Sequence, residues 1–267
     1  MKIVSLNLAG RTNFGRDYNR RIADIADFLS KEDADIVCLS EVTFDGGDSL
    51  AEVINEKLKK PYQHVRSEMS ERYTFDKFSA AAMENWEKGL FESSDEYLTD
   101  GMAVLSKLPI TNYRSIILTP APKDDRGRPD NRVRLVQNVD FSDGTKISNA
   151  HLATNNNNYL QLAELVKEIG AEKRMIIGDL NMPHSRHTLP NGQEILGMQD
   201  CKNIWGEKYT DSTEFTDYIS FPSEKSALDH LLLPDDWQFV SVRTVEGLSD
   251  HNALILEIER SDAECTL

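Results

Sequence analysis

The stretch Met175-Ile176-Ile177-Gly178-Asp179-Leu180-Asn181 joins an apolar run to a glycine, a carboxylate and a carboxamide. The apolar run predicts a short buried strand over 174–177, and Gly178 allows another backbone to approach closely. If the strand continues for two more residues, Asp179 and Asn181 point to the same side, because side chains alternate along a strand. An acid that can hold water or metal, close to an amide that can contact phosphate, makes this segment a candidate site.

Polar residues of similar kinds end three other strand-like segments, at Asn7, Glu41 and His151. A carboxylate or amide oxygen that leaves a buried strand can bind Mg²⁺, a cation that takes few protein oxygens and keeps its waters. Taken singly, each residue also fits a turn, a solvated strand end or a structural histidine.

The C-terminal third adds an acid and a histidine that can work together. Asp229 lies inside an apolar strand predicted over 228–233, where a carboxylate is costly unless it is paired. His251, in Ser249-Asp250-His251-Asn252, precedes another apolar strand. Histidine carries protons near neutral pH, and Asp229 can hold its ring as a buried orienting carboxylate.

Hydrophobic periodicity predicts an alternation of helices and strands. The helices are expected over 18–31, 49–58 (capped by Asp48) and 159–169 (capped by 155–158 and ended by Gly170). The strands are expected over 2–7, 35–41, 102–106, 115–119, 132–141, 146–150, 174–177, 228–233, 239–245 and 253–259, with a hairpin turn at 142–145 and an irregular or helical excursion over 66–98. This mixed order predicts an α/β protein in which two sheets pack together with helices outside.

The composition narrows the function classes. The 267 residues carry a formal net charge of −15, which disfavours tight non-specific binding to DNA unless a local basic patch exists. No apolar run is long enough for a membrane span, and no secretory signal is visible. The scattered Cys38, Cys201 and Cys265 form no zinc or disulfide pattern, so we expect reduced thiols and a cytoplasmic protein.

In chain order these polar residues resemble the motifs of the endonuclease/exonuclease/phosphatase superfamily, and the segment 100–110 is similar to that family's central Gly-x-Ala-Val-Leu-Ser strand. The resemblance extends from residue 3 to about residue 256. It implies a four-layer α/β sandwich, with two mixed β-sheets packed face to face and helices outside. It also implies one catalytic domain over 1–260, followed by a short tail over 261–267.

The resemblance implies a Mg²⁺-dependent hydrolase of phosphoesters that works by in-line attack of water, with Mn²⁺ as a substitute metal. The expected metal residues are Glu41, with Asn7 beside it and Asp250 near the metal. The expected phosphate contacts are Asn181 and His151. The expected residues for activating water are Asp179 and His251, with Asp229 orienting His251. Which of Asp179 and His251 is the base stays open.

Two further clusters leave alternatives open. The basic cluster consists of Lys123, Arg126, Arg128, Arg132 and Arg134. It is either a solvated loop or a substrate-binding segment, in which Arg132 and Arg134 contact phosphate, because arginine suits bidentate phosphate binding. His184 and His187 lie in a loop that either faces substrate, lies on the surface or holds a metal.

The class of substrate can be narrowed by elimination. The acidic charge disfavours an extended duplex groove, and no apolar hairpin for a bilayer surface is visible. A small phosphodiester or phosphomonoester, or a nucleic-acid end, therefore leads. The alternatives are a deoxyribonuclease-like nuclease and a catalytically silent binding module with the same fold.

Overall fold

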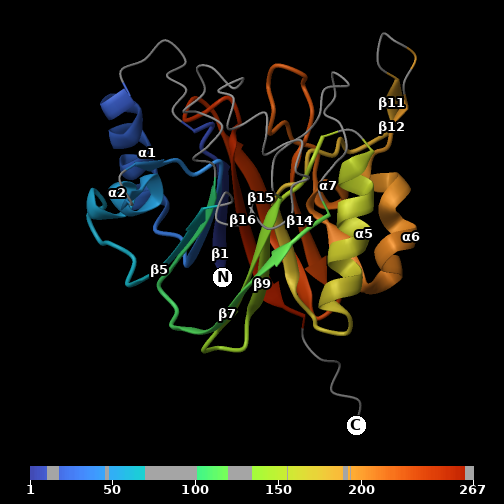
Figure 1. Cartoon of the computed structure of the whole chain (residues 1–267), viewed down its shortest axis with the longest axis horizontal. Coiled ribbons are helices and arrows are strands. Elements are labelled where there is room, and N and C mark those ends of the chain that lie inside the picture. The colour runs from blue at the N-terminus through green and yellow to red at the C-terminus, as the bar shows by residue number, and fades with distance from the viewer. Residues whose placement is uncertain are drawn as a thin grey trace, which may run out of the picture.

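Two mixed β-sheets of six strands each form the centre of the protein (Figure 1). The computed structural model describes residues 1–10, 18–45, 48–69, 101–119, 134–154, 156–188, 192 and 194–261. The first sheet contains, in spatial order, β15 (Trp237–Val245), β16 (Ala253–Arg260), β1 (Lys2–Asn7), β2 (Ile36–Ser40), β6 (Gly101–Ser106) and β5 (His64–Met69). The second contains β13 (Tyr209–Asp211), β14 (Asp229–Pro234), β10 (Met175–Asp179), β9 (Lys146–His151), β8 (Leu135–Phe141) and β7 (Ile110–Ile117).

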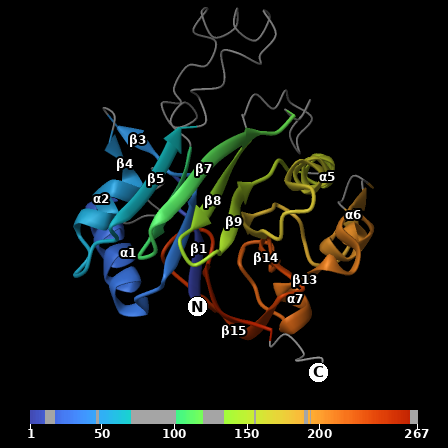
Figure 2. The ribbon, with the colours of Figure 1, turned by 90° about the horizontal axis from the view of Figure 1, so that it is seen from below.

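Helices lie on the outer sides of both sheets (Figure 2). The helices α1 (Tyr18–Glu32) and α2 (Leu50–Glu56) accompany the first sheet, and α5 (Asn157–Ile169), α6 (Lys202–Trp205) and α7 (Ser212–Phe215) accompany the second. The remaining short elements are β3 (Phe44–Asp45), β4 (Asp48–Ser49), β11 (His187–Thr188), β12 (Glu194–Ile195) and two 3₁₀ turns at Met198–Cys201 and Gly206–Lys208. No helix in the described part of the chain is both long and apolar enough to cross a membrane.

Three hydrophobic cores separate the four layers. On β1, Ile3 packs between the two sheets, whereas its neighbour Val4 packs beneath α1 and α2. On β14, Leu231 likewise faces the space between the sheets and Leu232 faces α5 and α6. This alternation lets each strand serve two cores at once, as a period of two residues requires. The predicted four-layer α/β sandwich is confirmed.

Strand direction brings the candidate residues to one edge of the sandwich. β1 and β2 are parallel, and so are β9 and β10, so their carboxyl ends carry Asn7, Glu41, His151 and Asp179. In the second sheet Asp179 pairs in register with His151 on one side and with Asp229 on the other. Three of the predicted site residues therefore stand in one row across three neighbouring strands.

Buried amide side chains join the two sheets next to this edge. Asn149 on β9 donates through Nδ2 to the backbone oxygens of Leu39 (3.3 Å) and Ala103 (3.2 Å) in the first sheet. Asn149 also donates to Gln137 Oε1 (3.1 Å), and Gln137 in turn donates to the carbonyl oxygen of Met102 (3.3 Å). These bonds fix the spacing of the two sheets two residues before His151.

The main differences from the expected elements lie at edge strands. β7 begins at Ile110 and ends at Ile117, instead of covering 115–119. β5 is a regular strand in a stretch expected to be irregular from residue 66, and residues 70–98 lie outside the described residues. Both strands stand at sheet edges in the described structure and keep one side half exposed, so their sequences lack the apolar run of a central strand.

The expected helix caps are also different. Ser49, and not Asp48, caps α2: its Oγ accepts from the Glu52 N–H (3.1 Å), while the Glu52 side chain accepts from the Ser49 N–H (3.0 Å). At α5 the side chain of Asn156 makes no cap hydrogen bond. Instead, Asn158 Nδ2 donates to the carbonyl oxygen of Asn181 (2.5 Å), which ties the helix start to the candidate site.

Gly178 provides a test of the close strand packing at this edge. It has a φ of 133°, and a Cβ there would lie 2.1 Å from the carbonyl oxygen of Ala150 on β9. We expect Gly178→Ala to lower the free energy of unfolding by about 3 kcal/mol or more, because both backbone conformation and space forbid a side chain. The matched control is Gly206→Ala, since Gly206 also has a positive φ of 62° but has nothing within 4 Å of a Cβ. This control should lose only about 1 kcal/mol in urea unfolding, and equal losses would contradict the packing argument.

Candidate functional site

Asp179, which is only 2% exposed, is the centre of the candidate site. Asn7 Nδ2 donates to Asp179 Oδ2 (2.9 Å) across the gap between the sheets and to Glu41 Oε1 (3.1 Å) within its own sheet. Asn7 Oδ1 accepts from the Ala9 N–H (2.8 Å), which fixes the orientation of the amide. The nitrogen of Asn7 therefore faces both carboxylates and holds them close together.

His251 and Asp229 form a buried pair beside Asp179. His251 Nδ1 lies 2.7 Å from Asp229 Oδ2, and His251 Nε2 lies 3.7 Å from Asp179 Oδ2. The ring of Phe221 packs against the imidazole, with ring centroids 4.7 Å apart. Because Nδ1 is held by Asp229, Nε2 is the nitrogen that can exchange a proton with a molecule near Asp179.

His151 and Arg134 stand on the other side of Asp179. His151 Nε2 lies 3.7 Å from Asp179 Oδ2, 3.9 Å from Glu41 Oε1 and 3.0 Å from Arg134 Nη1. Since a guanidinium can only donate, His151 Nε2 accepts in this contact and its proton is on Nδ1. The predicted substrate arginine at position 134 is thus buried against the predicted phosphate-contacting histidine.

Two further predicted residues, Asn181 and Asp250, direct their side chains to other partners than Asp179. The Asn181 N–H donates to Asp179 Oδ1 (2.9 Å), and its side-chain Nδ2 donates to the carbonyl oxygen of Leu152 (2.9 Å). Asp250 is exposed and accepts from Ser249 Oγ (2.9 Å). Its charge acts on His251, but no contact in the described part of the chain joins Asp250 to Glu41 or Asn7.

The electrostatics of the three central groups reflect their burial and mutual charges. Burial and the charge of Asp229 raise the pKa of Asp179 to about 6, although His251 and the hydrogen bond from Asn7 act in the opposite direction. Burial lowers the pKa of His251, but the charges of Asp229 and Asp179 outweigh it and raise the pKa to about 10. A carboxylate that titrates close to neutral pH beside a protonatable ring is a common arrangement for proton transfer.

Two carboxylates at this edge fit a hard divalent cation. Glu41, His151 and Asp179 each place a possible ligand atom within 4.8 Å of the others, but His151 Nε2 accepts from Arg134, so the carboxylates are the ligands offered; the Glu41 side chain is 26% exposed. Magnesium needs only one or two protein carboxylates, because it keeps several waters and binds substrate phosphate. A second group of Asp179, Asp229 and His251 is equally compact. In that group the Asp229–His251 hydrogen bond occupies two of the donors, which suits proton transfer better than metal binding.

The backbone at this edge is strained in the same places. Ala9, Glu41 and Asn181 have φ values of 51°, 50° and 51°, in the left-handed region that residues with a side chain rarely adopt. Each of them lies within two residues of the end of β1, β2 or β10. Such strain concentrates at functional sites, where surrounding contacts hold it in place.

Other residues singled out from the sequence are absent from this edge or lie outside the described residues. Lys123, Arg126, Arg128 and Arg132 are not among the described residues. His184 Nδ1 lies 2.7 Å from Thr213 Oγ1 and its Nε2 lies 3.0 Å from Gln199 Nε2, while His187 is exposed on β11. No metal-binding group among the described residues includes either histidine, so the metal alternative for this loop has no support.

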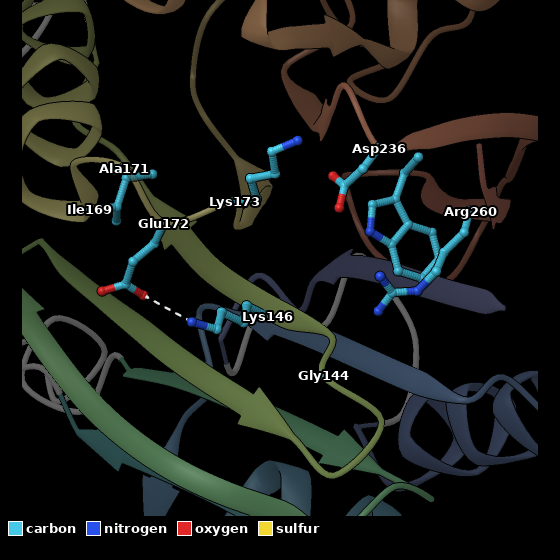
Figure 3. Close-up of a pocket in the computed structure, with 9 residues that line it drawn as sticks. Gly144, Lys146, Ile169, Ala171, Glu172, Lys173, Asp236 and Arg260 are labelled. Carbon is cyan, nitrogen blue, oxygen red and sulfur yellow. Dashed lines mark ion pairs between the residues drawn. The ribbon is translucent and has the colours of Figure 1, made fainter. Parts of the chain in front are cut away.

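A cavity of about 620 Å³ lies at the opposite end of the strands (Figure 3). It is lined by Gly144, Lys146, Ile169, Ala171, Glu172, Lys173, Asp236, Trp237 and Arg260. Lys146, which begins β9, pairs with Glu172 (3.8 Å), and the Arg260 guanidinium lies over the ring of Trp237 (4.8 Å). Since β9 ends at His151, the cavity and the candidate site are separated by the length of this strand.

Comparison with known structures shows that this fold is widespread. A structure from Beutenbergia cavernae, described as an endonuclease/exonuclease/phosphatase, has a TM-score of 0.70 at 15% identity and covers 98% of this chain and 72% of its own. The catalytic domain of human nocturnin with bound sulfate has a TM-score of 0.63 at 15% identity, and the match covers 98% of this chain and 93% of that chain. A mannosyl-6-phosphatase from Bacteroides thetaiotaomicron has a TM-score of 0.61 at 14% identity and covers 97% and 99%. These likenesses show the fold.

Sequence comparison shows the family. No protein in the curated set matches the chain significantly. The model of the Endonuclease/Exonuclease/phosphatase family matches residues 4–251, which is nearly the whole chain and includes every predicted site residue. The chain therefore belongs to the Endonuclease/Exonuclease/phosphatase family and is an enzyme that hydrolyses phosphoester bonds.

Proposed function

We propose that this enzyme is a Mg²⁺-dependent hydrolase that cleaves small phosphodiesters or phosphomonoesters, or phosphoesters at a nucleic-acid end, by in-line attack of water. The observation that supports this most is the grouping of Glu41 and His251 around Asp179, which sets a partly exposed carboxylate beside a buried proton-transfer pair. Glu41 is partly exposed, which suits the binding of a hydrated cation. His251 is buried, which suits the transfer of a proton.

Glu41 would be the main metal ligand in this proposal, with Asn7 beside it and Asp250 near the metal. Asn7 Nδ2 donates to Glu41 Oε1 (3.1 Å), so Asn7 would hold the ligating carboxylate in position from beside it. When bound, Mg²⁺, or Mn²⁺ in its place, would stabilise the charge on the phosphate oxygens and lower the pKa of a nearby water.

His251 and Asp179 would remove the proton from the attacking water. Asp229 holds Nδ1 of the ring and stabilises the imidazolium, so the proton taken from water can be held between Nε2 and Asp179, while the leaving oxygen on the opposite side of the phosphorus is protonated by solvent. Asp179 lies 3.7 Å from the same nitrogen, and its pKa of about 6 also suits a base. The two groups would share one proton, which leaves open which of them is the formal base.

Arg134, His151 and Asn181 would hold the scissile phosphate, together with Arg132. The guanidinium of Arg134 is buried at the site and already contacts His151. A charge-assisted contact of this kind binds phosphate oxygens strongly. A nocturnin catalytic domain with bound sulfate and a mannosyl-6-phosphatase are among the proteins of the same fold, which supports phosphoester hydrolysis.

The net charge of −15 favours a small or end-positioned substrate over a long duplex. A deoxyribonuclease-like activity is the second candidate, and it requires several phosphate contacts outside the described residues. A catalytically silent binding module is disfavoured, because Glu41, Asp179 and His251 are all present, and Glu41 and His251 each have a polar atom within 4.8 Å of Asp179. The buried free thiols of Cys38 and Cys201 support a reducing compartment such as the cytoplasm.

The metal role of Glu41 can be tested by removing its charge while keeping its size. We expect Glu41→Gln to lower activity on a chromogenic phosphodiester by a factor on the order of a thousand, with partial recovery at high Mg²⁺. Glu168→Gln, at an exposed position on α5, is the control and should keep full activity. Full wild-type activity in excess chelator would contradict the metal role.

The Asp229–His251 pair predicts a graded loss. His251→Ala should lower turnover on the order of a thousand-fold and remove one ionisation from the rising limb of the pH–rate profile. Asp229→Asn should lower turnover on the order of a hundred-fold and leave the Mg²⁺ dependence nearly unchanged, because the asparagine can still hold the ring. Steady-state kinetics across pH check both, with Asp235→Asn at an exposed position as control. If Asp229→Asn instead unfolds the protein, the role of Asp229 is structural.

The substrate class predicts a shallow salt dependence. Two phosphate contacts on a single strand should give a log–log slope of affinity near −1.4, at about −0.7 per contact, whereas a nuclease that follows a duplex through six or more contacts should give about −5 or steeper. Arg132→Ala with Arg134→Ala should raise KM more than it lowers kcat. Oligonucleotides with phosphorylated ends, small phosphoesters and plasmid DNA form the substrate panel. Rapid plasmid degradation with a steep slope would favour the nuclease instead.

A further inference from the structure

A second buried histidine–carboxylate pair lies directly behind the candidate site. On β14, Asp229 points between the sheets to His251, so its neighbour His230 points to the opposite face, toward the outer helices. His230 is fully buried, and Asp211 on β13 is 2% exposed. Neither residue is among the site residues expected from the sequence.

The hydrogen bonds of His230 define its charge. His230 Nε2 lies 2.7 Å from the carbonyl oxygen of Met182 and 3.1 Å from that of Ala227, so this nitrogen must carry a proton. His230 Nδ1 lies 3.1 Å from Asp211 Oδ1. Burial lowers the pKa of His230, but the charge of Asp211 outweighs it, and the pKa of Asp211 is held below its usual range in spite of burial. The pair is therefore an imidazolium and a carboxylate.

A second chain of hydrogen bonds connects Asp211 to the loop after Asn181. Thr213 donates its only hydroxyl proton to Asp211 Oδ2, so it must accept from His184 Nδ1 at 2.7 Å. Asp211 thus accepts from two chains of hydrogen bonds, one through His230 and one through Thr213, and both chains begin on the segment 181–184. His230 holds this segment at Met182, and Thr213 holds it at His184.

The charge of His230 also reaches the catalytic pair. His230 and Asp229 are neighbours in sequence, and their charges interact. Asp229 Oδ1 is buried without a hydrogen-bond partner among the described residues. A buried carboxylate oxygen that lacks a donor depends on nearby positive charge, which here comes from His251 on one face of β14 and from His230 on the other.

We propose that His230 and Asp211 are positioning residues for phosphoester hydrolysis: they fix the segment 181–184, and with it Asn181, and they place a positive charge behind Asp229. This inference rests on the proposed function. A purely structural role is the alternative, because buried ion pairs can often be replaced by apolar residues without loss of stability.

The test compares His230→Leu, His230→Gln and Asp211→Asn with the control Asp140→Asn. The control breaks another ion pair of the same sheet, between the half-buried Asp140 and the buried Arg174, at the strand ends remote from Asp179. With a chromogenic phosphodiester and Mg²⁺, His230→Leu should raise KM about tenfold, because Asn181 is released, and lower kcat about tenfold. Its rising pH limb should move to higher pH by on the order of half a unit, since removing a positive charge raises the pKa of neighbouring groups. Asp140→Asn should change stability only.

His230→Gln separates the two parts of the role. A glutamine amide can still donate to the carbonyl oxygen of Met182 but carries no charge, so KM should recover while the pH limb stays shifted. Asp211→Asn preserves the size of the side chain and provides a second variant if His230→Leu does not fold. It should raise KM as His230→Leu does.

A readout without turnover is the backbone amide NMR signal of Asn181, since His230 holds the neighbouring Met182. This signal should shift in His230→Leu and stay unchanged in Asp140→Asn. Folded His230→Leu protein with wild-type KM, pH profile and Asn181 signal would overturn the inference. If these are normal while Glu41→Gln is inactive, only the positioning role fails; if Glu41→Gln is fully active, the proposed function itself fails.

Discussion

The buried carboxylate of Asp179 is the constraint on which the rest of the site depends. An ionised carboxylate that is taken out of water needs donors or positive charge on every side, or it takes up a proton. Here Asn7 supplies a donor from the opposite sheet, the Asn181 N–H supplies another, and His251 supplies charge. Because these groups come from three separate segments, satisfying Asp179 brings both sheets and the C-terminal loop to one point.

The two sheets can meet this requirement only at a fixed distance. Asn149 and Gln137 set that distance, because their amides donate to main-chain oxygens of the first sheet from positions inside the second. A buried amide donor that loses its acceptor is costly, so a shift of one sheet against the other would leave several donors unpaired. The same bonds that hold the sandwich together therefore hold Glu41 and Asn7 on one sheet in reach of Asp179 on the other.

The site residues that could be predicted from the sequence are charged residues at positions where apolar side chains are expected. Asp179 and Asp229 stand in or directly after apolar strands, and this conflict indicated a role before any contact was known. The contacts across the sheets could not be predicted, since the amide of Asn7 is oriented by Ala9 and by a residue 172 positions away. His230 was overlooked because a histidine inside an apolar strand next to a stronger candidate carries no periodic signal. The exposure of Asp250 depends on a loop whose path the sequence does not specify.

An acidic protein can act on an anion when its net charge acts at long range and buried positive groups act at short range. The excess of acidic groups repels a polyanion over distances up to the Debye length, about 8 Å at physiological salt. The positive groups around the site, Arg134, His251 and His230, are all buried, so their fields act over short distances in a medium of low polarity. Under the proposed function, a single phosphate at the edge of the sandwich would be attracted by these groups and by the metal that offsets the site carboxylates, whereas the other phosphates of a long strand would meet mainly the excess acidic charge. Such a distribution of charge would select against length more than against phosphate itself.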